Sequence, residues 1–230
     1  MSPRKVNVDE HNPLPAAMIP ILTTEHFTLQ SARGVVMAEI GSRATIYLSA
    51  VSASVVALAF VTTLSDAEEL IRGFVFVLLP VLAFMGFVTK ARLVQLSYTD
   101  FHYQRAINRI RHFYVDTAPE TARYLLLSTH DDMAGVAQSA VYQEGRRMGL
   151  LTAAIMVAVI NYVIVGLLGG LLVDWVMDIS ATRLLVLGAL IGLAMGVIDY
   201  RLSAARWNRY VAGLEVRFPT PAEMEELQST

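Results

Sequence analysis

The chain has 230 residues, of which 55% are hydrophobic and 17% charged, with a mean hydropathy of +0.50 and a formal net charge of −2. Soluble domains contain about 25% charged residues, so this composition favours an integral membrane protein over a globular one. The slightly acidic balance gives no general positive field for nucleic acid, and the absence of cysteine excludes disulfides, thiolate metal sites and cysteine nucleophiles.

The first 93 residues are expected to form an arm followed by a long helical entry into the membrane. Residues 1–22 contain four prolines and predict an irregular N-terminal arm. The stretch Thr23-Thr24-Glu25-His26 is typical of a helix start, with Thr23 as the capping residue. Residues 23–93 are therefore predicted to hold an approach helix that continues into a first transmembrane hairpin.

Four uncharged apolar stretches are candidate membrane spans: residues 44–64, 73–89, 148–173 and 184–198. A bilayer core about 30 Å thick needs roughly 20 helical residues. The first and third stretches satisfy this length alone, whereas the two shorter ones rely on Lys90, Arg92 and Arg183 reaching outward from their ends. For the fourth, a buried soluble helix is the alternative. None of the stretches alternates as a barrel strand does, which favours helices.

The distribution of basic residues predicts the orientation. Arg72 and Arg183, 2 of the 18 Lys and Arg, lie in the two short acidic turns, and the other 16 lie outside these turns. Because Lys and Arg are retained on the cytoplasmic side, both termini and the middle loop are predicted to be cytoplasmic. The preference for Arg (16, against 2 Lys) suggests a GC-rich genome. We therefore expect a multi-pass protein of a bacterial plasma (inner) membrane.

The middle region, residues 94–147, is too long for a structureless connector and is expected to be a cytoplasmic helical hairpin. The helix of the second span is predicted to continue over residues 93–114. The sequence DTAPE at 116–120 predicts a restart capped by Thr117 and a second helix over 118–127. His130-Asp131-Asp132 is interpreted as a turn and helix cap rather than a metal site, before a third helix over 133–147.

The predicted fold is therefore all-α, an integral membrane protein with four transmembrane helices and a cytoplasmic helical hairpin between helices 2 and 3. Residues 148–200 form the second transmembrane hairpin. Residues 201–230 form a cytoplasmic tail, whose end at 219–230 is expected to be a short frayed helix or disordered.

Glycines recur at every fourth position in the last two spans, at Gly188, Gly192 and Gly196 and again at Gly166 and Gly170. Small residues on one face allow the backbones of two membrane helices to approach closely. Two interpretations remain open: packing of the third span on the fourth, or a subunit interface in a homo-oligomer.

Three further span residues attract attention. Asn161, followed by Tyr162, is the one strongly polar side chain near the middle of a span. An interhelical hydrogen bond is favoured for it, and a polar constriction in a pore or ligand site is the alternative. Pro80 predicts a fixed kink, with a gating hinge as the second interpretation. The spans contain no Asp, Glu, His, Lys or Arg, which argues against proton-driven pumps and many ion-coupled transporters.

A basic and aromatic stretch covers residues 98–114, and Arg105, Asn108, Arg109 and His112 share one face of its predicted helix. Such a face is either solvated or paired with acidic residues of the same loop, which is the favoured interpretation. The alternative is that Arg105, Arg109 and His112 bind phosphate, an anionic lipid headgroup or an acidic protein partner.

No nucleophile elbow, phosphate loop, dinucleotide fingerprint or metalloprotease motif is present, so no enzyme, cofactor or resident metal is expected. The first hypothesis is a non-enzymatic four-span membrane protein that forms a homo-oligomer and acts as an interaction or scaffold component with a cytoplasmic helical reader. An oligomeric ion channel or pore-forming effector is the alternative, and an intramembrane enzyme is the last choice. The bilayer, a second copy of the chain and an anionic lipid or acidic protein are the expected partners, and no nucleic acid is expected.

Overall fold

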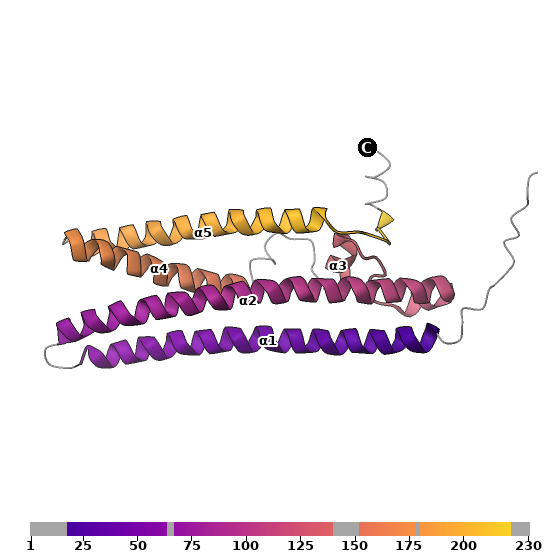
Figure 1. The fold of residues 1–230 in the computed structure, drawn as a ribbon, viewed down its shortest axis with the longest axis horizontal. Helices are drawn as coiled ribbons and strands as arrows, with labels where there is room; N and C mark the ends of the chain where they lie inside the picture. The colour runs from indigo at the N-terminus through magenta and orange to yellow at the C-terminus, as the bar shows by residue number, and fades with distance from the viewer. Residues whose placement is uncertain (1–17, 64–66, 140–151, 178–179, 222–230) are drawn as a thin grey trace, which may run out of the picture.

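The computed structural model describes residues 18–63, 67–139, 152–177 and 180–221, and these residues form helices without a strand. The expectations for residues 1–17, 140–151 and 222–230 lie outside the described residues. In chain order the elements are α1 (Met18–Val61), α2 (Ala67–Thr117), the 3₁₀ helix η1 (Pro119–Tyr124), α3 (Met133–Ser139), α4 (Ala153–Met177) and α5 (Ala181–Ala212) (Figure 1). Helices α1, α2, α4 and α5 are long and apolar enough to cross a membrane, which confirms the all-α class and the four candidate spans.

Helices α1 and α2 form a long antiparallel pair, and α4 and α5 form a second pair that lies along α2 (Figure 1). With 44 and 51 residues, α1 and α2 are about 66 and 76 Å long at 1.5 Å per residue. Both are far longer than a bilayer core. Their apolar runs lie at one end of the molecule, called here the apolar half (residues 44–63, 67–89, 153–177 and 181–198). The remaining described residues form the polar half.

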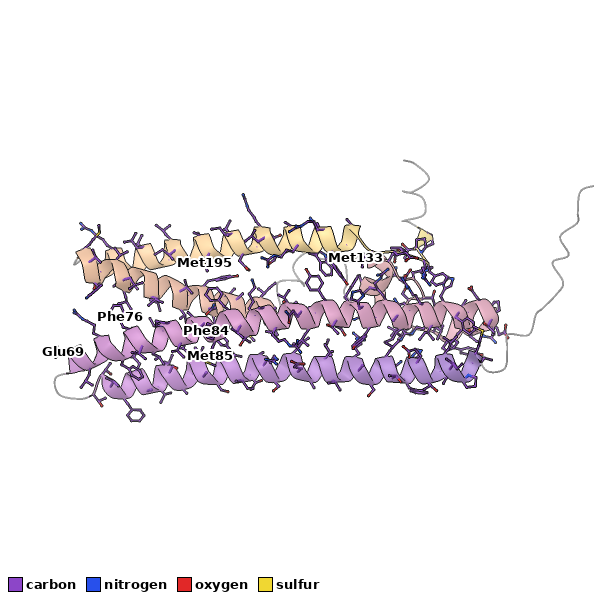
Figure 2. All side chains as sticks on the ribbon, in the orientation of Figure 1. Glu69, Phe76, Phe84, Met85, Met133 and Met195 are labelled. Carbon is purple, nitrogen blue, oxygen red and sulfur yellow. The ribbon has the colours of Figure 1, made fainter. Side chains whose placement is uncertain are left out.

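The apolar half is apolar both inside and outside. Its core joins α1, α2 and α4 through buried side chains such as Tyr47, Leu82 and Val157. Its outer surface also consists of large apolar side chains, among them Phe84, which is 68% exposed (Figure 2). A soluble bundle places polar residues on that outer face, so this apolar exterior agrees with four helices that are apolar enough to cross a membrane.

The structure corrects the predicted start of the first helix. Residues 18–22, assigned to an irregular arm, already belong to α1. Thr23 is therefore an interior position and not a cap. The neighbouring Thr24 hydroxyl donates to the Pro20 carbonyl one turn earlier at 2.8 Å, as threonines inside helices commonly do.

The predicted helix over 118–127 is also wrong, since only the 3₁₀ turn η1 forms there. Helix α2 extends to Thr117, and the Thr117 hydroxyl donates back to the Phe113 carbonyl at 2.8 Å instead of capping a new helix. Most of the segment faces solvent, with Leu126 almost fully exposed. Without an apolar face to bury, a short helix is marginal in water, so the local start signal is not sufficient.

The region predicted as a cytoplasmic tail is largely structured in its described part. Helix α5 continues through residues 201–212 and runs beside the polar half of α2 (Figure 1). The aromatic rings of Trp207 and Tyr210 on α5 pack against Tyr98 and Phe101 on α2, with ring centroids 4.7 to 6.1 Å apart. Residues 213–221, called here the C-terminal segment, then fold back over α2.

Candidate functional site

Ion pairs join three helices where the apolar half meets the polar half. On α1, Glu39 accepts hydrogen bonds from the Nε atoms of Arg43 at 2.7 Å and of Arg92, on α2, at 3.0 Å. On the other side of α2, the Lys90 ammonium donates to the Asp199 carboxylate of α5. We call these five residues the charged belt. The hydrogen bonds from Arg92 and then Arg43 lower the pKa of Glu39, so the carboxylate stays ionised.

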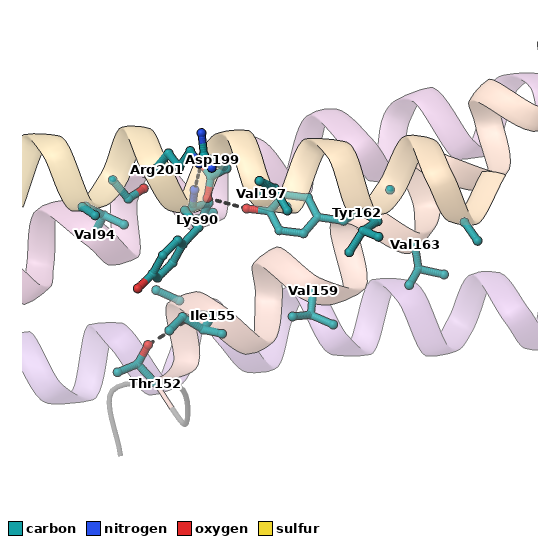
Figure 3. A pocket seen from close by; sticks show the side chains of 18 of the residues that line it. Lys90, Val94, Thr152, Ile155, Val159, Tyr162, Val163, Val197, Asp199 and Arg201 are labelled. Carbon is teal, nitrogen blue, oxygen red and sulfur yellow. Dashed lines mark hydrogen bonds and ion pairs between the residues drawn. The ribbon is translucent and has the colours of Figure 1, made fainter. Parts of the chain in front are cut away.

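Asp199 is shared between two helices. Its second carboxylate oxygen accepts a hydrogen bond from the Tyr162 hydroxyl of α4, so that Lys90, Asp199 and Tyr162 form one polar cluster at the end of the apolar half (Figure 3). Lys90 was expected to extend its span by reaching outward. The structure pairs it with Asp199 instead.

An open groove with a volume of about 1230 Å³ runs from this cluster along α4 and α5. Its walls are almost entirely apolar and include Val159 and Val163 of α4 and Val197 of α5 (Figure 3). The groove therefore combines an aliphatic channel with a charged end, which is the distribution of chemistry in a phospholipid.

The charged end of the groove carries an excess of positive charge. Lys90 and Arg201 line it together with a single acid, Asp199, which already pairs with Lys90. Arg201 is exposed and forms no ion pair with any residue that the structure describes. Tyr200 and Trp207 line the same end, where amphipathic rings suit a membrane boundary.

The five glycines singled out from the sequence all lie at the contact between α4 and α5. A Cβ on Gly192 would lie 2.7 Å from the Tyr162 carbonyl oxygen, and one on Gly188 would lie 2.9 Å from that of Gly166. Gly170 approaches the Leu184 carbonyl in the same way. Gly196 lies against the Tyr162 ring. The structure thus places the glycine stripe at a contact within one chain, the first of the two interpretations.

Asn161 points away from the groove into the contact between α4, α1 and α2. It is buried, and its Oδ1 accepts a hydrogen bond from the Tyr47 hydroxyl of α1 at 3.4 Å. It packs directly on Gly86 of α2, where a Cβ would collide with the amide. Neither cavity described here is lined by Asn161, although Tyr162 lines the groove. Pro80 is exposed on α2, which remains helical through it.

The basic face of α2 is covered by other parts of the same chain. Arg105, which is only 6% exposed, donates from Nε to the Asp131 carbonyl at 2.7 Å and from Nη2 to the Glu215 carbonyl at 2.6 Å. Arg109 donates from Nε to the Asp131 carboxylate at 2.7 Å. The His112 ring stacks on Phe218 with a centroid distance of 3.9 Å.

Asn108 completes this face by donating to the His130 carbonyl at 2.8 Å. This face, for which anion binding was the alternative interpretation, is therefore occupied by residues 130–135 and by the C-terminal segment. The acid that it holds, Asp131, belongs to the same middle region, as the favoured interpretation of internal pairing expected.

Asp131 and Asp132 hold the C-terminal segment by its backbone. The fully buried Asp131 carboxylate accepts hydrogen bonds from the Phe218 N–H at 2.7 Å and the Arg217 N–H at 3.1 Å. Asp132 accepts from the Thr220 N–H and also from the Gly135 N–H, both at 2.7 Å, so it caps α3 as predicted. Burial alone would raise the pKa of Asp131, but the hydrogen bonds from Phe218 and the Arg109 guanidinium lower it overall.

Sequence reasoning missed the pairing of Lys90 with Asp199 and the anchoring of the C-terminal segment. The sequence shows these residues but not their partners. Lys90 and Asp199 are 109 positions apart, Asp131 and the C-terminal segment are more than 80 positions apart, and only the relative register of the helices brings each pair together. Among the described residues, no group of three or more His, Asp or Glu is arranged to hold a metal. Comparisons with protein families, with curated proteins and with solved structures found no match.

Proposed function

We propose that this chain is a non-enzymatic, four-span protein of a bacterial plasma membrane, with the polar half in the cytoplasm, and that its groove holds an anionic phospholipid of the inner leaflet. The groove is the observation that supports this proposal, because its aliphatic walls lead to an end with one positive charge in excess. Chain termini and the middle region lie in the cytoplasm because the basic residues gather there.

The proposed interaction role of the polar half is supported by helices that continue from the membrane spans into it. Helices α1, α2 and α5 cross the charged belt without a break, so the module beyond the membrane is built from the spans themselves. A continuous helix transmits a tilt or rotation from one end to the other. A lipid that shifts α4 or α5 in the groove would therefore also shift the polar half. We propose that the polar half acts as a cytoplasmic reader in an interaction or scaffold role.

A homo-oligomer and an oligomeric channel remain predictions without support from the residues first assigned to them. The glycine stripe packs within the chain, and Asn161 is enclosed between three helices. Native mass spectrometry in detergent tests the oligomeric state. A strict monomer would rule out a pore shared between copies.

The lipid proposal is tested with purified full-length protein in neutral detergent. Added phosphatidylglycerol should bind saturably and raise the thermal midpoint, whereas phosphatidylcholine should do so much less. Arg201→Gln should weaken phosphatidylglycerol binding roughly tenfold, the value of one charge-assisted contact. Ala189→Phe, which places a ring in the groove, should abolish it. Arg206→Gln is the matched control, since Arg206 is an exposed arginine of the same helix outside the groove.

Equal binding of both lipids, or equal effects of Arg201→Gln and Arg206→Gln, would contradict the groove proposal. Orientation is tested separately with reporter fusions. A fusion at position 120 should report the cytoplasm and one at position 68 the opposite side. Fusions that report the same compartment would overturn the four-span topology.

A further inference from the structure

A second cavity, with a volume of about 450 Å³, lies in the polar half between α1 and α2. Both helices line it with the same spacing, at positions 30, 33, 34 and 37 of α1 and positions 104, 107, 108 and 111 of α2. Such positions form the seam between packed helices and are ordinarily apolar. Here the seam contains two arginines and three amide side chains, so it is not built as a hydrophobic contact.

The cavity collects positive charge without an acid in its lining. Arg33 donates from Nε to Asp100 at 2.7 Å, but Asp100 lies outside the lining. Arg111 donates from Nη1 to the Asn108 amide oxygen at 3.2 Å and forms no ion pair with any described residue. Burial and the nearby Arg33 both lower the pKa of Arg111, as expected for two guanidinium groups that repel each other. An anion between them would relieve this repulsion.

A neutral acceptor in the same wall also lacks a partner. Gln104 is only 5% exposed, and its Oε1 has no hydrogen-bond partner among the described residues. Burying such an oxygen without a hydrogen-bond donor is unfavourable. A ligand that fits the cavity therefore carries a hydroxyl or amine donor as well as a negative charge. The Ser139 hydroxyl, which donates to Asn108 at 3.0 Å, lines the same space.

The position of the cavity favours a soluble ligand over a lipid headgroup. Asn108 lies 16 residues beyond Arg92 of the charged belt, which corresponds to about 24 Å along α2. The headgroup region adds only about 5–8 Å to each side of the bilayer core. This step rests on the proposed function, in which the charged belt marks the membrane boundary.

We propose that this cavity binds a soluble phosphate ester with free hydroxyl groups, of the sugar-phosphate class. Arg111 and Arg33 hold the phosphate, and the Gln104 amide oxygen accepts a hydrogen bond from a ligand hydroxyl. Arginine suits this role because its planar donors match phosphate oxygens in pairs.

Isothermal titration of the full-length protein in neutral detergent, with ribose 5-phosphate and inorganic phosphate as probes, tests the proposal. Ribose 5-phosphate should bind saturably and more tightly than inorganic phosphate, because only the ester supplies the donors for Gln104. Arg111→Gln should weaken binding roughly tenfold or more. Gly34→Leu should abolish binding while leaving both arginines in place, because Gly34 lines the cavity, a Cβ there meets nothing within 4 Å, and the bulk of a leucine should compete with the ligand for this space.

Arg123→Gln is the control, because Arg123 lies over the Tyr124 ring of η1 and outside the cavity. Absence of saturable binding to either probe, or an equal loss in Arg123→Gln, overturns the proposal. Arg111-dependent binding of phosphatidylglycerol without binding of ribose 5-phosphate overturns the soluble ligand in favour of a headgroup. If Arg111→Gln does not fold, Gly34→Leu decides. None of these readouts depends on the groove or on membrane orientation, so the lipid proposal fails or succeeds independently.

Discussion

Replacing Asp131 with asparagine removes the negative charge on which two arginines and the C-terminal segment converge. The carboxylate accepts from Arg105 Nη2 at 3.3 Å, Arg109 Nε at 2.7 Å and the backbone N–H groups of Arg217 and Phe218. An asparagine offers a single acceptor oxygen and turns an NH₂ group toward these donors. The Arg105 guanidinium then stays buried without a counter-charge.

The magnitude follows from the burial of each partner. Leaving a buried charge unpaired costs about 3–5 kcal/mol, and Arg105 is 6% exposed. The side chain of Arg109 is 31% exposed, so solvent screens its interaction with Asp131, and the loss of that interaction costs less than about 1 kcal/mol. We therefore expect Asp131→Asn to open the C-terminal segment and residues 130–135, with a loss of amide protection of two to four orders of magnitude at roughly 1.4 kcal/mol per decade.

Hydrogen exchange with mass spectrometry on detergent-solubilised protein measures this loss in peptides that cover 213–221. Asp116→Asn is the matched control, because the Asp116 side chain is 63% exposed and its only described ion pair is with His112 at 3.6 Å. The same protection in Asp131→Asn and the wild type would refute the reasoning. The wild type should also lose protection in acid. Because the folded pKa of Asp131 is lowered, its stabilising contribution is present above the ordinary value near 4 and disappears as the pH falls through the folded pKa.

Three other variants test the remaining contacts. Gly192→Val should separate α4 from α5 and lower the thermal midpoint strongly, since its Cβ would lie 2.7 Å from a carbonyl oxygen, while Gly73→Val, in open space, should have little effect. Tyr47→Phe should destabilise the bundle by about 0.6–2 kcal/mol in chemical unfolding, the value of one interhelical hydrogen bond to Asn161. Burial first, and then a nearby arginine, lower the pKa of His26, so stability should fall as the pH drops below about 6.5, and His26→Gln should remove that part of the pH dependence.

The amino-acid sequence predicts features that depend on composition and on local spacing. The four apolar runs required four long helices, and the i, i+4 glycines required a close helix contact. The spacing identifies which face of each helix makes a close contact, but not which helix it contacts. From the sequence, Gly188 could therefore pack against Gly166 of the same chain or against a second copy of the protein. The same limit explains Asp199, whose partners Lys90 and Tyr162 depend on how far α2 and α4 slide along α5.

Local signals failed where tertiary contacts compete with them. The sequence around Thr117 has a cap, an early proline and a following glutamate, yet only η1 forms there, because no apolar face supports a longer helix. Residues 213–221 show the opposite case. Their sequence has little helical signal and they were predicted as part of a tail, but the structure anchors them on α2. The carboxylates of Asp131 and Asp132 satisfy the backbone of this segment directly, a device that leaves no periodic pattern in the sequence.

Asn108 connects the proposed cavity to the anchoring of the C-terminal segment. Its Oδ1 accepts from Arg111 inside the cavity, and its Nδ2 donates to the His130 carbonyl, one residue before Asp131. A phosphate that fixes Arg111 therefore fixes Asn108 and the loop that holds residues 213–221. Linkage makes the coupling reciprocal. Saturating ribose 5-phosphate should accordingly slow amide exchange in 213–221 of the wild type but not of Gly34→Leu. Identical exchange with and without the ligand would show that the cavity and the segment are energetically independent.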